Sequence, residues 1–440
     1  MPFDRRRFLI ASGVTGGLAA AASGGVLTYR DLHHAASEQP LAGGGVLVVV
    51  TLYGGNDGLN MVIPAGDPAY QAARPELAYS AGDALPLSDG LALHPALTGL
   101  RGLWNSHQLA IVRGVGYPKP DHSHFRSMAI WQTASPDTVA STGWLGRWLD
   151  AQAKADPKAA SSVAALRAIS VGPTLAPLVV GASTAAAAVP TGSFKAPAGA
   201  LGQELHLLYR PDRADGPLAA RVASSGADLF TVAGALAPVL TARSDQTQAP
   251  TGQLDAGSDP TAATTNAAGG GTAGTTAKAD AGELGAQLDV VAACIRAGVP
   301  TRVYSVNLGG FDTHTEEKAT QARLLGQLDA ALTRFQSTVG ADPHGAGVTT
   351  LVYSEFGRRV AANANNGTDH GTAAPVLVLG SRVRGGFYGD QPSLTSLDDG
   401  DLKATTDFRS IYATLLERVL ASDAGPVLGA GEHFPRLSFV

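Results

Sequence analysis

The residues of this chain that could do chemistry gather in five short polar segments, several of which follow apolar runs. They combine carboxylates, imidazoles, a serine and an arginine, which cost free energy to bury unless they pair with each other or with a bound ion or anion. Each segment therefore has two interpretations, a solvated loop or part of a binding site. The segments are GGND (54–57), DHSHFRSM (121–128), GFDTH (310–314), SEFGR (354–358) and TDHGT (368–372).

Six of these side chains are candidate metal ligands. Mixed carboxylate and imidazole sets suit Zn²⁺ or Mn²⁺, whereas an all-oxygen subset suits Mg²⁺ or Ca²⁺. Two such ions about 3.5–4 Å apart would activate a nucleophile and stabilise a leaving oxygen. The six candidates are Asp57, Asp312, His314, Glu355, Asp369 and His370.

A nucleophile is the candidate role for Ser123, in a segment that we expect to open a helix. The helix dipole and free N–H groups would favour an anion there, and His122 beside the serine could orient or deprotonate it. The alternative is that Ser123 is an ordinary N-cap. The same segment contains His124 and Arg126, to which the sequence assigns no role.

Arg358 also has two interpretations. It could clamp a phosphate or sulfate with its planar guanidinium, or pair with Glu355 three residues earlier. Each of the other segments likewise has an ordinary alternative. GGND is typical of a tight turn, and FDTH could be a solvated loop or a helix cap.

An alternation of strands and helices must position these segments. The pattern indicates a mostly parallel sheet with helices on both faces, an architecture in which ligands bind beyond the carboxyl ends of the strands. The predicted strands are a run ending near Tyr53 and residues 109–117, 302–310, 347–353 and 374–380, and the predicted helices are 94–108, 322–340 and 407–421.

The composition of the 440 residues is that of a globular protein, with 45% hydrophobic and 16% charged residues. The net charge of -5 offers no bulk basic field, so we expect no nucleic-acid partner. A single cysteine, Cys294, excludes an intrachain disulfide and a multi-cysteine metal site. Its apolar surroundings predict a buried, inert thiol.

The N-terminus has the layout of a twin-arginine export signal. Arg5, Arg6 and Arg7 precede a modest apolar stretch rich in glycine and alanine. Glycines and serines dilute this stretch too far for a stable membrane span. We therefore predict a signal within residues 1–40, with an undetermined cleavage site, and a periplasmic or extracellular destination with the twin-arginine machinery as partner.

Residues 244–283 have low complexity and almost no large apolar side chains, which predicts a disordered insertion in one domain of residues 45–440. Glycines 269, 271 and 274 match a dinucleotide-binding spacing, but no strand precedes them, so this match is discarded. A G-x-S-x-G elbow, a Walker loop and an H-E-x-x-H motif are all missing from the sequence.

An ordered set of motifs resembles a known family. VTLYGGNDGLN, AIVRGVGYPKPDHSHFRSMAIWQT, GGFDTH, SEFGRRV, GTDHGT and DFRSIYATLLE together look like the bacterial twin-arginine-exported family called domain of unknown function 1501. The fold of that family is similar to the alkaline phosphatase and sulfatase superfamily. The resemblance implies a single alkaline phosphatase-like domain, a three-layer sandwich.

The resemblance also implies roles for individual positions. Asp57 resembles the first-strand metal aspartate, and Ser123, with His122 beside it, occupies the place of the nucleophile. Asp312 and His314 resemble a metal-binding Asp/His pair, and His370 resembles the last metal histidine.

One segment departs from the superfamily pattern. Where phosphatases have a strand ending in Asp-His-Gly, this chain has Glu355 and Phe356. Phe356 removes a ligand, so one metal position is weakened, filled by His122 or Asp369, or lost.

The expected function is an exported metal-dependent hydrolase or transferase acting on phosphate or sulfate esters, with a small anionic ester as substrate. In it Ser123 attacks and Arg358 holds the anion. The alternative is a non-catalytic exported protein that keeps the fold and binds an ion, a glycan or a partner. A dinucleotide oxidoreductase is a third reading, disfavoured because the first strand lacks the glycine fingerprint.

Overall fold

The computed structural model describes residues 44–156, 166–192, 199–210, 212, 215–247 and 281–440. The predicted export signal lies outside these residues. The predicted insertion is described only at its ends, where residues 244–247 finish one helix and residues 281–283 lead into the next.

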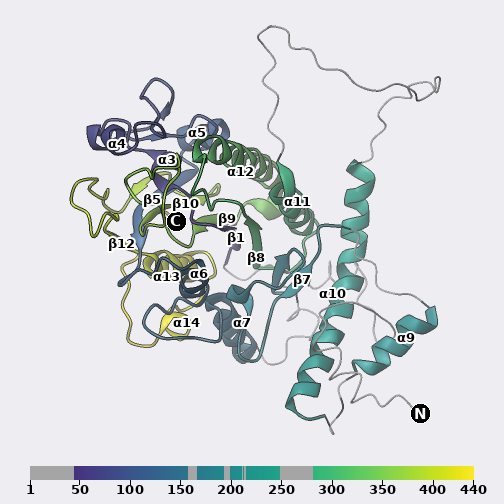
Figure 1. Ribbon diagram of the computed structural model, residues 1–440. Coiled ribbons are helices and arrows are strands. Elements are labelled where there is room, and N and C mark those ends of the chain that lie inside the picture. Colours follow the sequence, from purple (N-terminus) through teal and green to yellow (C-terminus); the bar gives the residue numbers. More distant parts are fainter. Residues whose placement is uncertain (1–43, 157–165, 193–198, 211, 213–214, 248–280) are drawn as a thin grey trace, which may run out of the picture.

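A nine-stranded sheet forms the centre of the fold, in the order β11-β5-β10-β9-β1-β8-β6-β7, with β12 paired to β5 (Figure 1). All neighbouring strands run parallel except β10, which is antiparallel to both β9 and β5. The predicted mixed α/β fold with a mostly parallel sheet is thus confirmed. The strands are β1 (Val46–Leu52), β5 (Leu109–Gly116), β6 (Ala168–Val171), β7 (Ala187–Val189), β8 (Val303–Leu308), β9 (Val348–Ser354), β10 (Ala374–Leu379), β11 (Gly386–Tyr388) and β12 (Thr406–Asp407).

The central strand β1 is buried along its whole length. Successive side chains of a strand point to opposite faces of the sheet. Val48 and Val50 accordingly belong to one hydrophobic core, and Leu47 and Val49 to another. A continuous apolar run is therefore what a strand covered on both faces requires.

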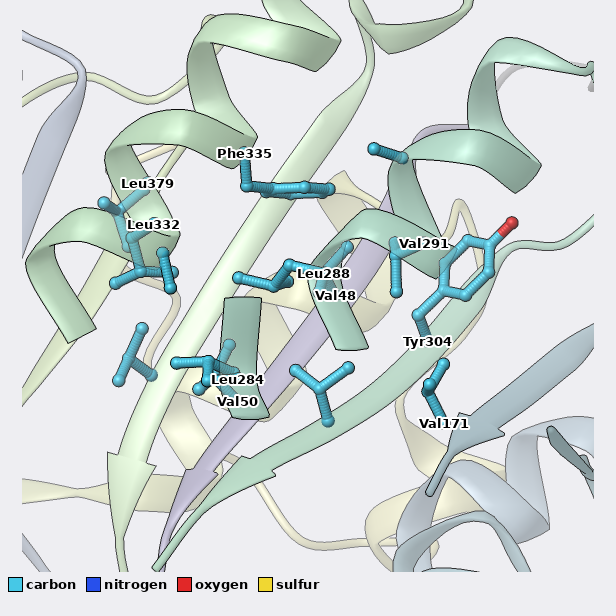
Figure 2. Close-up of a cluster of buried hydrophobic side chains, with 14 of the residues drawn as sticks. Val48, Val50, Val171, Leu284, Leu288, Val291, Tyr304, Leu332, Phe335 and Leu379 are labelled. Carbon is cyan, nitrogen blue, oxygen red and sulfur yellow. The ribbon is translucent and has the colours of Figure 1, made fainter. Parts of the chain in front are cut away.

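Four helices contribute to the hydrophobic core on one face of the sheet. Figure 2 shows Leu288 and Val291 of one helix and Phe335 of the next, packed over Val48 and Val50. Each fully buried side chain of this size contributes about 1.5–3 kcal/mol relative to exposure. Cys294 is fully buried in the same core, as predicted. The helices are α5 (Thr98–Asn105), α10 (Pro217–Thr247), α11 (Gly282–Arg296) and α12 (Glu317–Gly340).

On the other face, aromatic stacking fixes the helices. Trp131 stacks on Tyr353 of β9 with ring centroids 4.8 Å apart, and Trp144 stacks on Tyr412 at 4.1 Å. The first of these contacts anchors α6, whose first residue is His124, against the strand that precedes Glu355. The helices of this face are α6 (His124–Thr133), α7 (Trp144–Ala155), α13 (Phe408–Arg418) and α14 (Gly425–Leu428).

Smaller elements surround this framework. Strands β2 (Val62–Ile63), β3 (Leu85–Pro86) and β4 (Ala92–Leu93) form a separate three-stranded sheet, and α3 (Gly58–Met61), α4 (Pro68–Ala73), α9 (Gly199–Leu208) and the 3₁₀ helices Pro177–Val179 and Pro343–Gly345 complete the order. Helices α9 and α10 lie beyond β7 (Figure 1). Within the described residues, the helices are too short or too polar to cross a membrane.

Candidate metal centre

All five polar segments lie at one edge of the sheet, and four of them supply the cluster of candidate ligands and their partners. The segments after β5, β8 and β9 leave the carboxyl ends of mutually parallel strands. Strand β10 runs in the opposite direction, so residues 368–372, which precede it, lie at the same edge. The reversed strand therefore returns the chain to the place where the other three segments end.

Three side chains from these segments form a compact set of ligand atoms. His124, Asp312 and His370 each offer one such atom, and these atoms all lie within 4.8 Å of one another. Asp312 Oδ1 is 3.5 Å from His124 Nε2 and 3.3 Å from His370 Nε2. His314 joins from the side, with its Nε2 3.1 Å from Asp312 Oδ1 and 2.9 Å from His370 Nε2.

The opposite nitrogen of each imidazole faces an acceptor. His124 Nδ1 lies 2.9 Å from Glu355 Oε1, and His370 Nδ1 lies 2.7 Å from the carbonyl oxygen of His122. His314 Nδ1 lies 3.2 Å from Asp369 Oδ1. Because a carboxylate or carbonyl accepts, each Nδ1 must donate, which in a neutral ring leaves a lone pair on Nε2.

Each of the three Nε2 atoms therefore has a lone pair within 3.1–3.5 Å of the Asp312 carboxylate oxygen, an arrangement that a positive charge would stabilise. Protons could supply part of it. However, the 2.9 Å gap between Nε2 of His314 and Nε2 of His370 holds at most one proton. Burial also lowers the pKa of His370, against the hydrogen bonds to the His122 carbonyl and Asp312 that raise it. A divalent cation held by His124, Asp312 and His370 would satisfy the lone pairs of that set.

The geometry fits an ion of the zinc type. Zn–N bonds of about 2.0–2.1 Å in a tetrahedron place neighbouring ligand atoms about 3.3 Å apart, and Asp312 Oδ1 lies 3.5 Å from His124 Nε2 and 3.3 Å from His370 Nε2. Histidine ligands in proteins usually donate their other N–H to a carboxylate or carbonyl, as all three do here. His124 Nε2 is buried and has no hydrogen-bond partner in the part of the chain that the structure describes.

Asp312 is the anionic member of this set. Partial burial raises the pKa of its carboxyl, but the hydrogen bond from Arg358 and the neighbouring His370 outweigh that effect and hold the pKa at about 2. The side chain is half exposed. Asp312 is therefore ionised at neutral pH and accessible from solvent.

Glu355 and Asp369, which the sequence predicted as ligands, lie behind the imidazoles instead. Glu355 is buried, and its Oε1 also accepts a hydrogen bond of 2.9 Å from the Gly54 N–H. Its Oε2 accepts from the Ser354 hydroxyl at 3.0 Å. These contacts leave Glu355 to orient His124, as Asp369 orients His314.

Arg358, predicted to hold the substrate anion, is not free to do so. Its side chain is fully buried. The guanidinium donates to Asp312 Oδ1 at 2.9 Å and to the carbonyl oxygens of Gly54, Gly55, Phe311 and Thr368. Arg358 therefore fixes the loops after β1 and β8 rather than facing a substrate.

Asp57, predicted as a metal ligand, lies outside the cluster. It is fully buried, accepts from the Leu59 N–H at the start of α3, and pairs with Arg74 at 2.5 Å. Burial opposes its ionisation, yet Arg74 lowers its pKa. The pKa of the neighbouring Glu317 shifts in the opposite direction, because burial and the Asp57 charge raise it to about 9.

His122 and Ser123 lie at the rim of the cluster. Ser123 is the N-cap of α6, and its exposed hydroxyl accepts from the Arg126 N–H at 3.5 Å. The His122 side chain turns away to Asp401, with Nε2 2.7 Å from Oδ2. The predicted nucleophile thus serves here as a helix cap, next in the chain to the candidate ligand His124.

His124 is the residue that sequence reasoning left without a role. Its signal was the HSH pattern at a predicted helix start, which drew attention to the serine. The structure instead directs His124 inward, because it begins α6 where the helix approaches the loop after β9.

A cavity of about 550 Å³ adjoins the cluster. Residues 116–122 and 398–407 supply most of its walls, together with Thr372 and Phe356. The Phe356 ring centroid lies 4.9 Å from the ring centroids of both His124 and His370. Phe356 is therefore common to the cavity and to the cluster.

Fold and site together define an α/β protein with a candidate metal centre at the carboxyl edge of its main sheet. Residues 46–424 match the model of the family described as "Protein of unknown function (DUF1501)", and the chain belongs to this family. No curated protein and no solved structure matches the chain.

Proposed function

We propose that this protein is a metal-dependent hydrolase or transferase acting on phosphate or sulfate esters. His124, Asp312 and His370 would hold one divalent ion, with His314 as a fourth ligand. The observation that carries the proposal is that Nε2 of each of the three imidazoles lies 3.1–3.5 Å from Asp312 Oδ1, while an acceptor faces each Nδ1.

An ion bound there would polarise an ester, phosphoryl or sulfuryl oxygen and lower the pKa of water. The chain's own contribution is to orient the ligands. Glu355 holds His124, Asp369 holds His314 and the backbone of residue 122 holds His370. The half-exposed Asp312 and His314 leave one side open to solvent.

The sequence resemblance implies a fold of the alkaline phosphatase and sulfatase type, and that implied fold favours the reaction class by analogy. The strand exits that would hold ligands in such a fold are the ones that carry Asp312, His314 and His370. In this chain, Asp57 and Arg358 are engaged elsewhere. The proposed centre is therefore smaller than the two-ion arrangement expected from the sequence.

Two nucleophiles suit this centre. One is Ser123, which follows His122 and precedes the ligand His124; its hydroxyl would have to leave a long 3.5 Å contact with the Arg126 N–H. The other is water. Turnover by Ser123→Ala separates them, because loss of activity with retained metal supports the serine, and unchanged activity supports water.

We also propose export by the twin-arginine route to the periplasm or the cell exterior, on the strength of Arg5–Arg7 and the apolar stretch after them. That route carries folded proteins, which suits a chain that takes up its ion before export. Cell fractionation of the wild type and of an Arg6→Lys, Arg7→Lys variant would test it.

A second candidate function is a non-catalytic exported protein that binds an ion. The observation in its favour is the fourth ligand, His314, because structural zinc sites are closed by four protein ligands and catalytic sites keep a position open. His314→Ala discriminates, since it should open a catalytic site without emptying it but should weaken a closed structural one strongly.

The experiment that tests the main proposal joins metal analysis to an ester panel. We expect about one equivalent of a divalent transition metal per chain in the wild type, and loss of it in His370→Ala and Asp312→Asn. His344→Ala is the matched control, because His344 is an exposed histidine paired with Asp342 away from the cluster. A wild-type protein without bound metal would contradict the proposed metal centre. A wild-type protein that binds metal but hydrolyses none of the phosphate and sulfate esters would contradict the proposed enzymatic activity.

A further inference from the structure

We infer that Asp401 is a positioning residue of the candidate metal centre. It acts through His122, whose backbone carbonyl fixes the imidazole of the candidate ligand His370. This inference rests on the metal centre of the proposed function. It adds to that centre a carboxylate from residues 398–402, a segment that contributes none of the candidate ligands.

Asp401 and His122 form a close pair. Oδ2 of Asp401 lies 2.7 Å from Nε2 of His122, and the aspartate side chain is only 6% exposed, whereas the imidazole is 45% exposed. Because an ionised carboxylate only accepts, Nε2 of His122 must donate this hydrogen bond. Hydrogen bonds to a charged group are shorter and stronger than those between neutral groups. The buried carboxylate therefore fixes the orientation of the more exposed imidazole.

The backbone of His122 links this pair to the centre. Its carbonyl oxygen lies 2.7 Å from Nδ1 of His370, and Nε2 of the same ring lies 3.3 Å from Asp312 Oδ1. A metal-binding imidazole that donates its other N–H to a fixed acceptor is held in one tautomer and one orientation. A shift of residue 122 would therefore turn the His370 ring away from the ion or release it.

The segment that carries Asp401 is itself held against the centre. Asp401 exchanges two backbone hydrogen bonds with Asp398, of 2.9 and 3.0 Å. The carbonyl oxygen of the buried Leu402 accepts from the hydroxyl of Thr372, which is two residues from His370 in the chain. Asp401 therefore restrains His122 from a fixed support.

Arg359 completes this set of contacts. Its Nε lies 3.5 Å from Oδ1 of Asp401, the carboxylate oxygen that does not pair with His122. Its N–H donates to the carbonyl oxygen of Asp369, next in the chain to His370, at 3.0 Å. The guanidinium offsets the cost of burying the carboxylate. The two oxygens of Asp401 thus face two residues that both contact the segment around His370.

Zn²⁺ affinity is the property that this role affects. A partner that holds a metal ligand directly is worth about 10–100-fold in affinity. Asp401 acts through one further residue, so we expect Asp401→Ala to weaken Zn²⁺ binding by less, about threefold to tenfold. Asp401→Asn should keep most of the affinity, because its amide oxygen still accepts from His122. Competition with a chromogenic chelator would measure each dissociation constant in the full chain.

A double-mutant cycle tests the route through His122. His122→Ala keeps the backbone carbonyl but removes the side chain that Asp401 holds, so it should weaken Zn²⁺ binding to a similar degree. Residues that act through one shared contact have non-additive effects. The variant with both substitutions should therefore bind Zn²⁺ nearly as well as either single variant. Additive losses would mean that Asp401 and His122 act independently, and the inference would be wrong.

The matched control is Asp342→Ala, which breaks another Asp–His pair, with His344, away from the cluster. It should leave Zn²⁺ affinity unchanged. If Asp401→Ala lowered the Tm of the metal-free protein but bound Zn²⁺ as tightly as the wild type, Asp401 would support only the fold. If Asp401→Ala failed to fold, His122→Ala, at a half-exposed side chain, would decide: an affinity equal to that of the wild type would contradict the inference.

These outcomes differ from a failure of the proposed function. A protein whose Zn²⁺ affinity depends on Asp401 but that hydrolyses no phosphate or sulfate ester would support this inference and contradict the enzymatic activity. Ester hydrolysis with a Zn²⁺ affinity independent of Asp401 would do the reverse. A wild-type protein that binds no Zn²⁺ would contradict both the metal centre and the role of Asp401.

Discussion

Glu355 is not among the candidate ligands but orients one of them, because its Oε1 accepts the Nδ1 proton of His124. In Glu355→Gln the amide can face the His124 ring in two ways. Its oxygen is a weaker acceptor for the Nδ1 proton than the carboxylate, and its NH₂ group would instead disfavour the tautomer that carries this proton. Loss of such a partner costs about 10–100-fold in metal affinity. Competition with a chromogenic chelator would measure it.

The control for that variant is Glu417→Gln, at a surface pair with Arg436. It should leave metal affinity unchanged. An equal affinity in wild type and Glu355→Gln would mean that Glu355 supports only the Gly54 loop.

Glu317 and Asp57 form a second buried site, and the ionisation of these two carboxyls affects the free energy of unfolding. Glu317 has a pKa of about 9, against an ordinary value of 4.5. Between these values the folded protein holds a proton that the unfolded chain has lost, so the free energy of unfolding falls as pH rises. Asp57 acts oppositely, since its lowered pKa makes the fold lose stability as pH falls below the ordinary range for aspartate.

Glu317→Gln should therefore flatten the loss of stability between about pH 6 and pH 9. The glutamine keeps a polar partner for Asp57 and for the Thr368 hydroxyl, which donates to Glu317 in the native chain. Thermal unfolding across that pH range would measure the change. A profile as steep as that of the wild type would show that Glu317 is ionised in the folded state.

At the scale of elements, α6 carries the candidate ligand His124 in its first turn, so the cap of this helix affects the position of that imidazole. Ser123→Ala removes the side-chain acceptor for the Arg126 N–H. Because that contact is long, we expect a loss of about 0.5–1 kcal/mol, at the low end for N-caps. Urea unfolding would measure it, and Ser123→Asp should restore the cap.

This variant also separates two roles of one residue. Ser123→Asp restores stability without a hydroxyl nucleophile. If activity followed stability through the alanine and aspartate variants, Ser123 would be a cap; if both were inactive and the metal stayed bound, it would be the nucleophile.

The elements themselves were largely readable from the sequence. The apolar runs at residues 46–52, 303–308 and 348–354 are strands, because a chain buried on both faces must be apolar throughout. The reversed direction of β10 was not readable, since its run from 374 to 379 looks like that of a parallel strand. Direction depends on pairing with β5 and β9, which are remote in the chain.

Only part of the candidate site could be predicted from the sequence, again because the deciding contacts join remote parts of the chain. The common edge of strand ends brings Asp312, His314 and His370 together, as strand exits predict. The pairing of Asp57 with Arg74 depends on how α3 and α4 fold back, which no local pattern shows. Arg358 looked available because its five acceptors come from three separate stretches of chain, residues 54–55, residues 311–312 and Thr368.

At the scale of the whole molecule, the proposed ion would join three segments that are distant in the chain, through the side chains of His124, Asp312 and His370. Anything that binds only the folded state stabilises it, by about 2.7 kcal/mol when the free ligand is at 100 times its Kd. Chelation should therefore lower the Tm of the wild type, and added Zn²⁺ should restore it. His370→Ala should respond to neither treatment, and a Tm of the wild type indifferent to both would argue against the centre.

Phe356 has a consequence for stoichiometry. Its buried ring packs against both His124 and His370 on the side of the cavity, where a side chain with a lone pair would extend the coordination. Titration with a divalent metal should thus reach its end point at one ion per polypeptide, because the Phe356 ring offers no ligand atom to a second ion. Replacing that hydrocarbon ring with imidazole, in Phe356→His, is the single change expected to raise the end point toward two.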